Sequence, residues 1–265
     1  MIEVSNLSCG YGSKEILNKV TFSIQKGTVL SILGANGSGK STLLKAIVGL
    51  LPYKGKITID GNDTKSLSRK QRASLVAYVP QSTSIPFDFN VLEIVLMGRF
   101  HSSSSNLSYS KKDKDEANEA LKEVGIENFK DRIFRNLSGG EKQLVLIARA
   151  LAQKSKIIIM DEPVTGLDLG NQMRLLDLVS TLAKDGKTVI QTTHYPDHAL
   201  RVSTQVLWLD KGEILAVGSP IEVINTQRIF DVYNVESKLI RHKDNDISYV
   251  LPLKFTKKVN NDIKT

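Results

Sequence analysis

The chain has 265 residues, of which 41% are hydrophobic and 24% are charged, with a formal net charge of +8. These fractions are ordinary for a globular protein and exclude a disordered, low-complexity chain. No apolar run reaches the roughly 20 residues that span a bilayer, and the first residues lack the pattern of a signal peptide. We therefore expect a soluble, cytoplasmic protein, and the single cysteine, Cys9, fits a reducing compartment.

The positive charge has two interpretations. It belongs either to a solvated surface with a basic tail at 254–265, or to a field that attracts nucleotides or an anionic membrane surface. Because the basic residues are scattered along the chain, the first interpretation is favoured, and we expect no nucleic-acid partner.

The first 80 residues predict a region rich in strands. Glycine-separated runs of β-forming residues are expected to form strands at 2–7, 19–24, 28–33, 56–60 and 74–80. An apolar-periodic helix follows the third run. Four residues of this helix are expected to share one buried face: Leu43, Leu44, Ile47 and Leu50.

A helical pattern follows from 86 to 150, with a serine-rich loop at 102–105. It contains an apolar segment at 90–100, a charged amphipathic helix at 111–126 and a third helix that begins after Ser138. Four residues of the third helix are expected to be buried: Leu144, Ile147, Ala148 and Leu151.

The rest of the chain returns to strands. Buried β-branched runs at 156–163 and 188–194 lie on either side of a helical pattern at 170–186, which is typical of a parallel sheet in an α/β fold. A hairpin is predicted at 205–218, and a short helix after 219 precedes a possible second hairpin around 242–248. The sequence assigns no chemistry to the segment from about Glu236 onward. This segment forms either a structural hairpin or a contact used for regulation or dimerisation.

Residues 34–42, GANGSGKST, match the phosphate-binding P-loop pattern G-x-x-x-x-G-K-[ST], between a predicted strand and a predicted helix. Glycines let successive N–H groups converge on phosphate oxygens. Lys40 offers a cation to the β- and γ-phosphates, and Ser41 offers a hydroxyl to Mg²⁺. The alternative, a glycine-rich turn with an incidental lysine, does not explain this placement. The predicted nucleotide-binding residues are Gly34, Asn36, Gly37, Ser38, Gly39, Lys40, Ser41 and Thr42.

Two adjacent carboxylates follow the apolar run at 157–160. Asp161 is the expected Mg²⁺ ligand, and Glu162 is the expected general base that polarises a water molecule for attack on the γ-phosphorus. Gln81 and His194 also follow predicted strands, where open α/β sheets place ligands. Each of these two, and Asp168, has an alternative as a capping or surface residue.

A second glycine-rich segment, LSGGE at 137–141, also precedes a helix. A capping box explains Ser138 and Glu141, but it does not explain two glycines in the first turn, each of which costs about 1 kcal/mol relative to alanine. Close approach of a phosphate to the backbone explains them, so Ser138, Gly139 and Gly140 are predicted as a second phosphate-binding segment.

Together, the P-loop, Gln81, LSGGE, IIIMDEP, GLD and His194 resemble an ATP-binding cassette (ABC) ATPase over about residues 1–220. The resemblance implies a P-loop NTPase cassette with three parts: a mixed-sheet, RecA-like core at 1–85 and 151–220, an antiparallel β subdomain, and a helical subdomain inserted at 86–150. Residues 221–265 then form a C-terminal extension. Lys142 and the Val164–Gly166 segment depart from the commonest residues of the family, and neither change removes a catalytic group.

The resemblance also implies roles for individual residues. Tyr11 is expected to stack on adenine, Gln81 to contact Mg²⁺ and a membrane partner, and His194 to contact the γ-phosphate, while Asp168 belongs to the nucleotide site. Two copies are expected to pair head to tail, with each ATP held between one P-loop and the LSGGE segment of the other copy. ATP and Mg²⁺ are the implied cofactors.

Three stretches narrow the resemblance further: VLEIVLMGRF, DLGNQ and TTHYPDHAL are similar to ATPase subunits of prokaryotic importers for iron chelates, cobalamin, haem or molybdate. This implies separate membrane permease subunits that dock on 87–101, an indirect link to a solute-binding protein, and a peripheral position on the cytoplasmic face of the inner membrane. The alternatives are a soluble ABC ATPase that acts on protein or nucleic-acid machinery, and an exporter ATPase.

Overall fold

The amino-terminal region forms a four-stranded antiparallel sheet in the order β2-β1-β4-β5. The computed structural model describes residues 1–83, 85–100, 109–241 and 248–256. The strands are β1 (Ile2–Tyr11), β2 (Lys14–Ile24), β4 (Lys54–Ile59) and β5 (Asn62–Asp63). Inward residues alternate with exposed ones along much of β2, so this sheet buries one face and leaves the other to solvent.

A second sheet has six strands in the order β10-β9-β3-β8-β7-β6, and all neighbours are parallel except β9 and β10. The strands are β3 (Val29–Leu33), β6 (Val76–Val79), β7 (Ile157–Met160), β8 (Thr188–Thr192), β9 (Gln205–Asp210) and β10 (Glu213–Gly218). Strands β3, β7 and β8 are buried along their whole length, as expected for central strands of a sheet that is covered on both faces. The parallel strands bring their carboxyl ends to one edge, where the polar residues that follow them gather.

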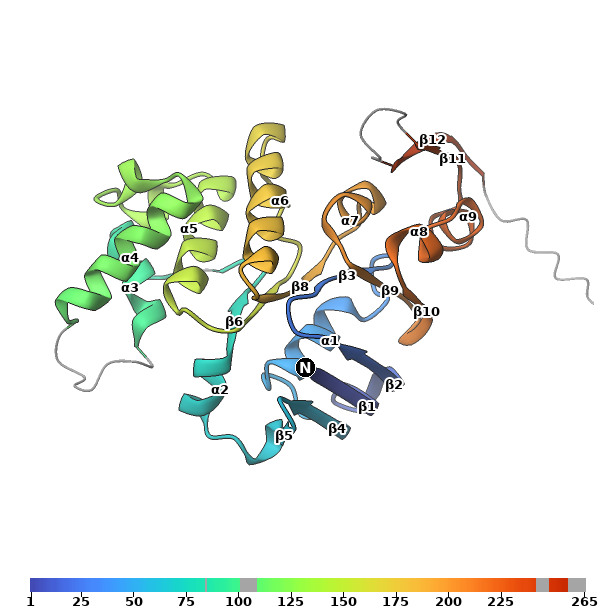
Figure 1. The fold of residues 1–265 in the computed structure, drawn as a ribbon, viewed down its shortest axis with the longest axis horizontal. Helices are drawn as coiled ribbons and strands as arrows, with labels where there is room; N and C mark the ends of the chain where they lie inside the picture. The colour runs from blue at the N-terminus through green and yellow to red at the C-terminus, as the bar shows by residue number, and fades with distance from the viewer. Residues whose placement is uncertain (84, 101–108, 242–247, 257–265) are drawn as a thin grey trace, which may run out of the picture.

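Helix α1 (Lys40–Ile47) packs between the two sheets (Figure 1). Leu43, Leu44 and Ile47 are fully buried there, as predicted. The prediction is wrong for Leu50, which is 66% exposed. The helix ends at Ile47 and Gly49 adopts a left-handed conformation, so Leu50 lies beyond the periodic part of the helix.

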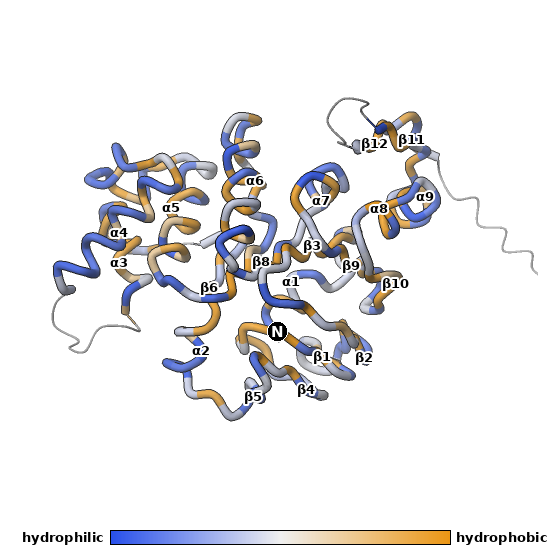
Figure 2. Tube along the Cα trace, viewed as in Figure 1, coloured by the Kyte–Doolittle hydropathy of each residue, from blue (hydrophilic) through white to orange (hydrophobic). Residues whose placement is uncertain are grey.

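Helices cover the other face of the six-stranded sheet. Residues 157–160 show the alternation: Ile157 and Ile159 face the cluster around α1, whereas Ile158 and Met160 face the helices. These helices are α3 (Val91–Leu96), α4 (Lys111–Val124), α5 (Gly139–Ala152) and α6 (Leu169–Lys184), with 3₁₀ turns η2 (Met97–Arg99), η3 (Glu127–Phe129) and η4 (Phe134–Asn136). Helix α4 is mostly hydrophilic along its length (Figure 2). The predicted helical insertion is thus built from α3, α4 and α5, and the four predicted apolar residues of α5 are buried.

A buried ion pair ties these helices together. Arg99 Nε donates to Asp113 Oδ1 over 3.0 Å, and Arg99 Nη1 donates to the Ala152 carbonyl over 2.7 Å. Both charged side chains are only 8% exposed. The segment after α3 is therefore fixed to the first turn of α4 and the last turn of α5.

The carboxyl-terminal part packs beside β9 through a third apolar cluster. Its elements are α7 (Pro196–Val202), α8 (Pro220–Val223), α9 (Thr226–Tyr233), β11 (Val235–Arg241) and β12 (Ser248–Phe255). Strands β11 and β12 form the second predicted hairpin, although its turn at 242–247 lies outside the described residues. The predicted serine-rich loop at 102–105 also lies outside them.

Several elements differ from the prediction: helix α2 (Arg69–Leu75) and strand β5 were not predicted, and β2 begins at Lys14 instead of residue 19. Residues 74 and 75 belong to helix α2, so the strand predicted at 74–80 begins at Val76. A capping box between Ser68 and Gln71 starts that helix. Helix α7 was not predicted, because it has only seven residues and begins at a proline. None of the helices in the described part of the chain is long and apolar enough to cross a bilayer.

Candidate nucleotide-binding site

The P-loop runs from the end of β3 to the start of α1. Gly37 and Gly39 have positive φ angles of 79° and 107°, which non-glycine residues adopt at a cost. Gly34 is required by packing, because a Cβ there would lie 2.1 Å from the Leu209 carbonyl oxygen. The loop therefore has no side chain at these glycines, so its backbone N–H groups are exposed directly before the N-terminus of α1. Exposed N–H groups at a helix N-terminus favour the binding of an anion.

Lys40 is the cation of this loop. Its Nζ donates to the carbonyl oxygens of Gly34 and Ala35 over 2.8 and 3.0 Å, and the side chain is buried. Burial lowers the pKa of Lys40, and the carboxylates of Glu162 and Asp161 oppose this shift. The ammonium group is thus held inside the loop on the side that faces the carboxylates.

Asp161 and Glu162 follow β7 and are fixed by one hydroxyl from β8. Thr192 Oγ1 donates to Asp161 Oδ1 over 2.7 Å and accepts from the Glu162 backbone N–H over 2.8 Å. Glu162 has a left-handed φ of +48°, a conformation that is uncommon for a non-glycine residue and is often found at functional sites. Thr192 was missed in the sequence; its only signal there is a polar residue inside a buried strand.

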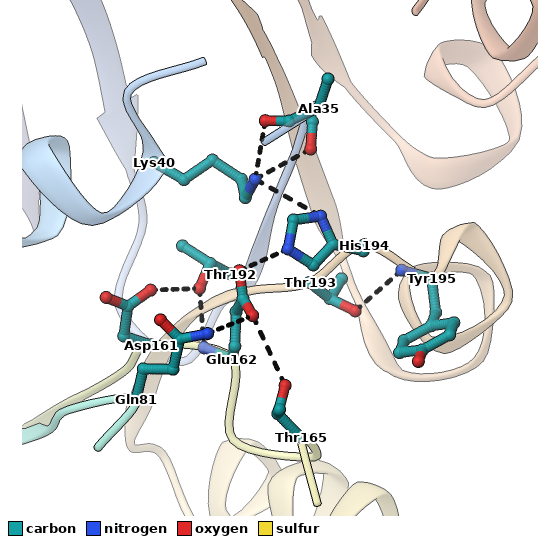
Figure 3. A network of polar contacts seen from close by, with 11 residues as sticks. Ala35, Lys40, Gln81, Asp161, Glu162, Thr165, Thr192, Thr193, His194 and Tyr195 are labelled. Carbon is teal, nitrogen blue, oxygen red and sulfur yellow. Dashed lines mark hydrogen bonds and ion pairs between the residues drawn. The ribbon is translucent and has the colours of Figure 1, made fainter. Parts of the chain in front are cut away.

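The Glu162 carboxylate lies at the centre of a polar network (Figure 3). Gln81 Nε2 donates to Glu162 Oε2 over 2.8 Å, and His194 Nε2 pairs with Glu162 Oε1. On the other side of the same ring, His194 Nδ1 lies 3.5 Å from Lys40 Nζ. The structure therefore brings together the predicted residues Lys40, Gln81, Glu162 and His194 from four separate segments.

These residues line one cleft of about 560 Å³. Its lining residues are Ile16, Asn36, Gly37, Gly39, Lys40, Ser41, Thr42, Gln81, Glu162, Thr165, His194 and Tyr195. A cleft of this size holds a small-molecule ligand. Tyr11 is not among the lining residues; its ring is 49% exposed and its hydroxyl lies 3.4 Å from Lys45 Nζ.

The predicted Mg²⁺ ligands offer hard oxygen donors. Within the described part of the chain, no group of three or more His, Cys, Asp or Glu side chains is placed to hold a metal ion by itself. The hydroxyl of Ser41, the carboxylate of Asp161 and the amide oxygen of Gln81 are each oxygen donors of the kind that Mg²⁺ prefers. Asp161 keeps Oδ2 outside its hydrogen bond to Thr192, which leaves that oxygen for a metal.

The LSGGE segment lies in a different pocket. This pocket, of about 470 Å³, is lined by Ser138, Gly140, Glu141 and Asp168 among others, and it shares no lining residue with the P-loop cleft. The predicted capping box is present: Ser138 Oγ accepts from the Glu141 N–H, and Glu141 Oε2 accepts from the Ser138 N–H. Asp168 caps α6 by accepting from the Asn171 N–H over 2.8 Å.

The two glycines of LSGGE differ in their surroundings. A Cβ on Gly140 would lie 2.7 Å from the Gly166 carbonyl oxygen, so packing within the chain requires a glycine there. A Cβ on Gly139 would meet no atom of the described chain within 4 Å. The expectation that ligand approach explains both glycines is therefore corrected: the chain's own packing accounts for Gly140, and Gly139 alone lacks such a reason among the described residues.

The family model described as "ABC transporter" matches residues 17–165, which is more than half of the chain. This chain belongs to the ABC transporter family. Its cassette is the ATP-binding, ATPase part of such transporters.

Two curated relatives of this ABC protein match almost its whole length. A probable iron chelatin transport ATP-binding protein of Helicobacter pylori is 37% identical over 257 residues, covering 95% of this chain and 100% of that protein. A manganese transport system ATP-binding protein of Halalkalibacterium halodurans is 37% identical, covering 92% of this chain and 96% of that protein.

Solved structures support the same fold. A metal-chelate type ABC transporter in an inward-facing conformation matches with a TM-score of 0.83 and 31% identity, covering 96% of this chain and 97% of that chain. A dimeric ATP-binding cassette bound to ADP and phosphate matches with a TM-score of 0.74 and 32% identity, covering 83% of this chain and 99% of that chain.

Proposed function

We propose that this ABC ATPase powers the import of a metal chelate, of the iron-siderophore, haem, cobalamin or molybdate type, through separate permease subunits. The proposed ATP hydrolysis is supported by the position of the Glu162 carboxylate, which Gln81 and His194 hold at the P-loop cleft. The metal-chelate part is supported by the printed names of the Helicobacter relative and of the inward-facing transporter.

In the proposed reaction, Glu162 accepts a proton from a water molecule as that water attacks the γ-phosphorus in line. The bond from the γ-phosphorus to the bridging oxygen of ADP breaks, and ADP and inorganic phosphate leave. Lys40 and His194 would stabilise the charge on the phosphate oxygens, because their side chains meet at the same end of the cleft.

Mg²⁺, held by Ser41, Asp161 and Gln81, would neutralise charge on the β- and γ-phosphates. The rest of the P-loop, from Gly34 to Thr42, would surround the phosphates with backbone N–H groups, and Tyr11 would support the adenine ring.

Glu162→Gln tests the general base. The amide is nearly isosteric with the carboxylate but cannot accept a proton, so we expect ATP binding within about threefold of wild type and turnover reduced by roughly 10²- to 10⁴-fold. Steady-state phosphate release and ATP-analogue binding measure the two effects. Glu127→Gln is a matched control, because it makes the same change at an exposed residue that does not line the cleft. Normal ATP turnover in Glu162→Gln would show that Glu162 is not the general base.

We further propose that two copies pair head to tail and share each ATP. The LSGGE pocket and the P-loop cleft have no lining residue in common. Ser138, Gly139 and Gly140 would therefore bind the phosphates of a nucleotide that is held in the P-loop cleft of another copy. Asp168 borders the LSGGE pocket and would lie at the same contact. The dimeric cassette among the solved structures supports this arrangement.

Ser138→Arg tests the pairing. The long cation would block the LSGGE pocket, and we expect loss of ATP-dependent dimerisation and turnover with ATP binding to the monomer unchanged. Light scattering of the chain with a magnesium ATP analogue measures the dimer. Weakened ATP binding in the monomer would instead assign Ser138 to the site within its own chain.

The permease would dock on residues 87–101, which follow Gln81 in the chain; residue 101 lies outside the described residues. Three large apolar side chains there are exposed: Phe87 by 67%, Met97 by 36% and Phe100 by 65%. Docking would hold the protein at the cytoplasmic face of the membrane, and a solute-binding protein would act through the permease. We propose the cassette as residues 1–220, with its helical insertion at 86–150, and a C-terminal extension at 221–265.

The second candidate is import of a metal ion without a chelator, favoured by the manganese-transport relative. Purification of the intact transporter with its solute-binding protein, followed by mass spectrometry of the retained ligand, distinguishes the two. An organic chelate supports the first candidate, and a bare metal ion supports the second. Purification without any membrane subunit would overturn both and favour a soluble ABC ATPase, whereas solute movement out of the cell would indicate an exporter.

A further inference from the structure

His194 lies in a short turn between strand β8 and helix α7. Before this turn, the Thr193 N–H donates to the Ile32 carbonyl of β3 over 3.1 Å, which fixes the chain to the sheet. Within the turn, the Tyr195 N–H donates to Thr193 Oγ1 over 3.1 Å (Figure 3). The helix then begins at Pro196. The position of the His194 ring therefore depends on the sheet on one side and on the first turn of α7 on the other.

The two ends of α7 are held differently. At the far end, Val202 is buried, and the hydroxyl of Ser203, the residue after the helix, donates to Ser31 Oγ of β3 over 2.6 Å. In the first turn, by contrast, Asp197 is exposed. The sheet thus holds the end of α7 that is far from His194, and the end beside His194 needs another contact.

That contact comes from the C-terminal hairpin. The backbone N–H of Val250 in β12 donates to Asp197 Oδ1 over 2.5 Å. In the two-stranded sheet β11-β12, an N–H that does not pair with the other strand lies on an open edge, and the Asp197 carboxylate covers this position. Hydrogen bonds to a charged acceptor are roughly twice as strong as neutral ones. The bond therefore suits a role in holding the helix in place.

The hairpin provides a fixed support for this bond. The Val250 side chain is 7% exposed and belongs to the same apolar cluster as Ala199 of α7 and Trp208 of β9. The end of β12 is tied back to α9, because the Thr256 N–H donates over 2.9 Å to the carbonyl of Asn234, the residue after that helix. The hydrogen bond therefore joins the first turn of α7 to a packed element.

We propose that Asp197 is a positioning residue for ATP hydrolysis, which holds the first turn of α7 and so keeps the His194 ring beside Glu162. His194 Nε2 pairs with Glu162 Oε1, and Nδ1 of the same ring lies 3.5 Å from Lys40 Nζ. Because both contacts belong to one ring, a movement of the turn changes both. The C-terminal extension then influences hydrolysis, although none of its described residues lines the cleft. This inference rests on the proposed function, in which His194 acts on the phosphate oxygens.

Asp197→Ala removes the acceptor, whereas Asp197→Asn keeps an oxygen at the same place. We would measure phosphate release by the full chain at saturating magnesium ATP, and its affinity for a non-hydrolysable ATP analogue. We expect Asp197→Ala to lower kcat by roughly threefold to tenfold, the effect of losing one hydrogen bond, with nucleotide affinity unchanged. Asp197→Asn should keep kcat near wild type. Since Asp197 is exposed, the thermal midpoint should change little in either variant.

The matched control is Asp177→Ala. It removes another exposed carboxylate that contacts α7, at Arg201 over 3.3 Å, and it should change neither kcat nor affinity. Unchanged kcat in Asp197→Ala would overturn the proposal. A loss of kcat that Asp177→Ala or Asp197→Asn shares in full would also overturn it, because the effect would then not come from the hydrogen bond to Val250.

A double-mutant cycle shows whether Asp197 acts through His194. Once His194→Ala has lowered kcat, adding Asp197→Ala should lower it no further, because the ring that Asp197 positions is gone. An equal further loss would contradict the proposal, since it indicates a general weakening of the fold. If His194→Ala slows hydrolysis and Asp197→Ala does not, the inference fails and the proposed function stands. If His194→Ala hydrolyses ATP at the normal rate, the role of His194 in the proposed function is wrong, and the inference fails with it.

Discussion

Replacement of Asp113 tests the ion pair that joins α3, α4 and α5. Hydrogen bonds from Ser110 and Arg99 lower the pKa of Asp113 from 3.8 to about 2, against the opposing effect of burial. At 1.36 kcal/mol per pKa unit, this corresponds to about 2 to 3 kcal/mol of folding free energy. Asp113→Asn also leaves Arg99 buried without its carboxylate, and breaking a buried pair costs roughly 3–5 kcal/mol. We therefore expect a loss of about 2–5 kcal/mol at pH 7.

The pH dependence of this loss has a defined sign. Because the folded-state pKa is below the unfolded-state value, the stabilisation is fully present above about pH 5 and disappears as the pH falls toward 2. Denaturant unfolding of wild type and Asp113→Asn should show a stability difference that shrinks between pH 5 and pH 3. Asp115→Asn, on the exposed side of the same helix, should cost less than about 0.5 kcal/mol. A difference of less than 1 kcal/mol at pH 7 that is also constant with pH would refute the reasoning.

Two further changes test the site. Thr192→Val keeps the shape of the side chain but removes the hydroxyl that joins Asp161 to the Glu162 backbone. We therefore expect kcat for ATP hydrolysis to fall by about 10- to 100-fold, with ATP affinity nearly unchanged. An unchanged kcat would mean that packing alone places the two carboxylates. Gly140→Ala should lower the free energy of unfolding by about 1–3 kcal/mol, because its Cβ meets the Gly166 carbonyl, whereas Gly139→Ala should have little effect on thermal stability. The reverse order would contradict the packing assigned to the two glycines.

Local motifs made much of the geometry of the candidate site predictable. The P-loop is a contiguous pattern, and its place between β3 and α1 follows from the flanking periodicity. Glu162 was predictable because it follows a fully buried strand. Strand ends of a parallel sheet lie at one edge, so the meeting of Gln81, Glu162 and His194 follows from topology.

Other features depend on contacts that local sequence does not encode. Thr192 appears as one more residue of a buried strand until the sheet places it beside Asp161, 31 residues away in the chain. Gly140 is explained by Gly166, which only the packing of α5 against the segment before α6 brings close. Leu50 fits the helical period but lies beyond a left-handed Gly49. Tyr233 has no motif at all, and its place beside Trp208 depends on the packing of the whole third cluster.

The separation of the P-loop cleft from the LSGGE pocket has a consequence for mixtures of damaged chains. In a head-to-tail pair, a copy lacking Lys40 still offers an intact LSGGE pocket, and a copy with Ser138→Arg still offers an intact P-loop. Each copy alone would be inactive, yet a mixed pair would contain one site with both lesions and one site with neither. Equal amounts of the two would restore about a quarter of the working sites, if pairing is random. Under the proposed head-to-tail pairing, complementation between two inactive chains follows from the layout of a single one.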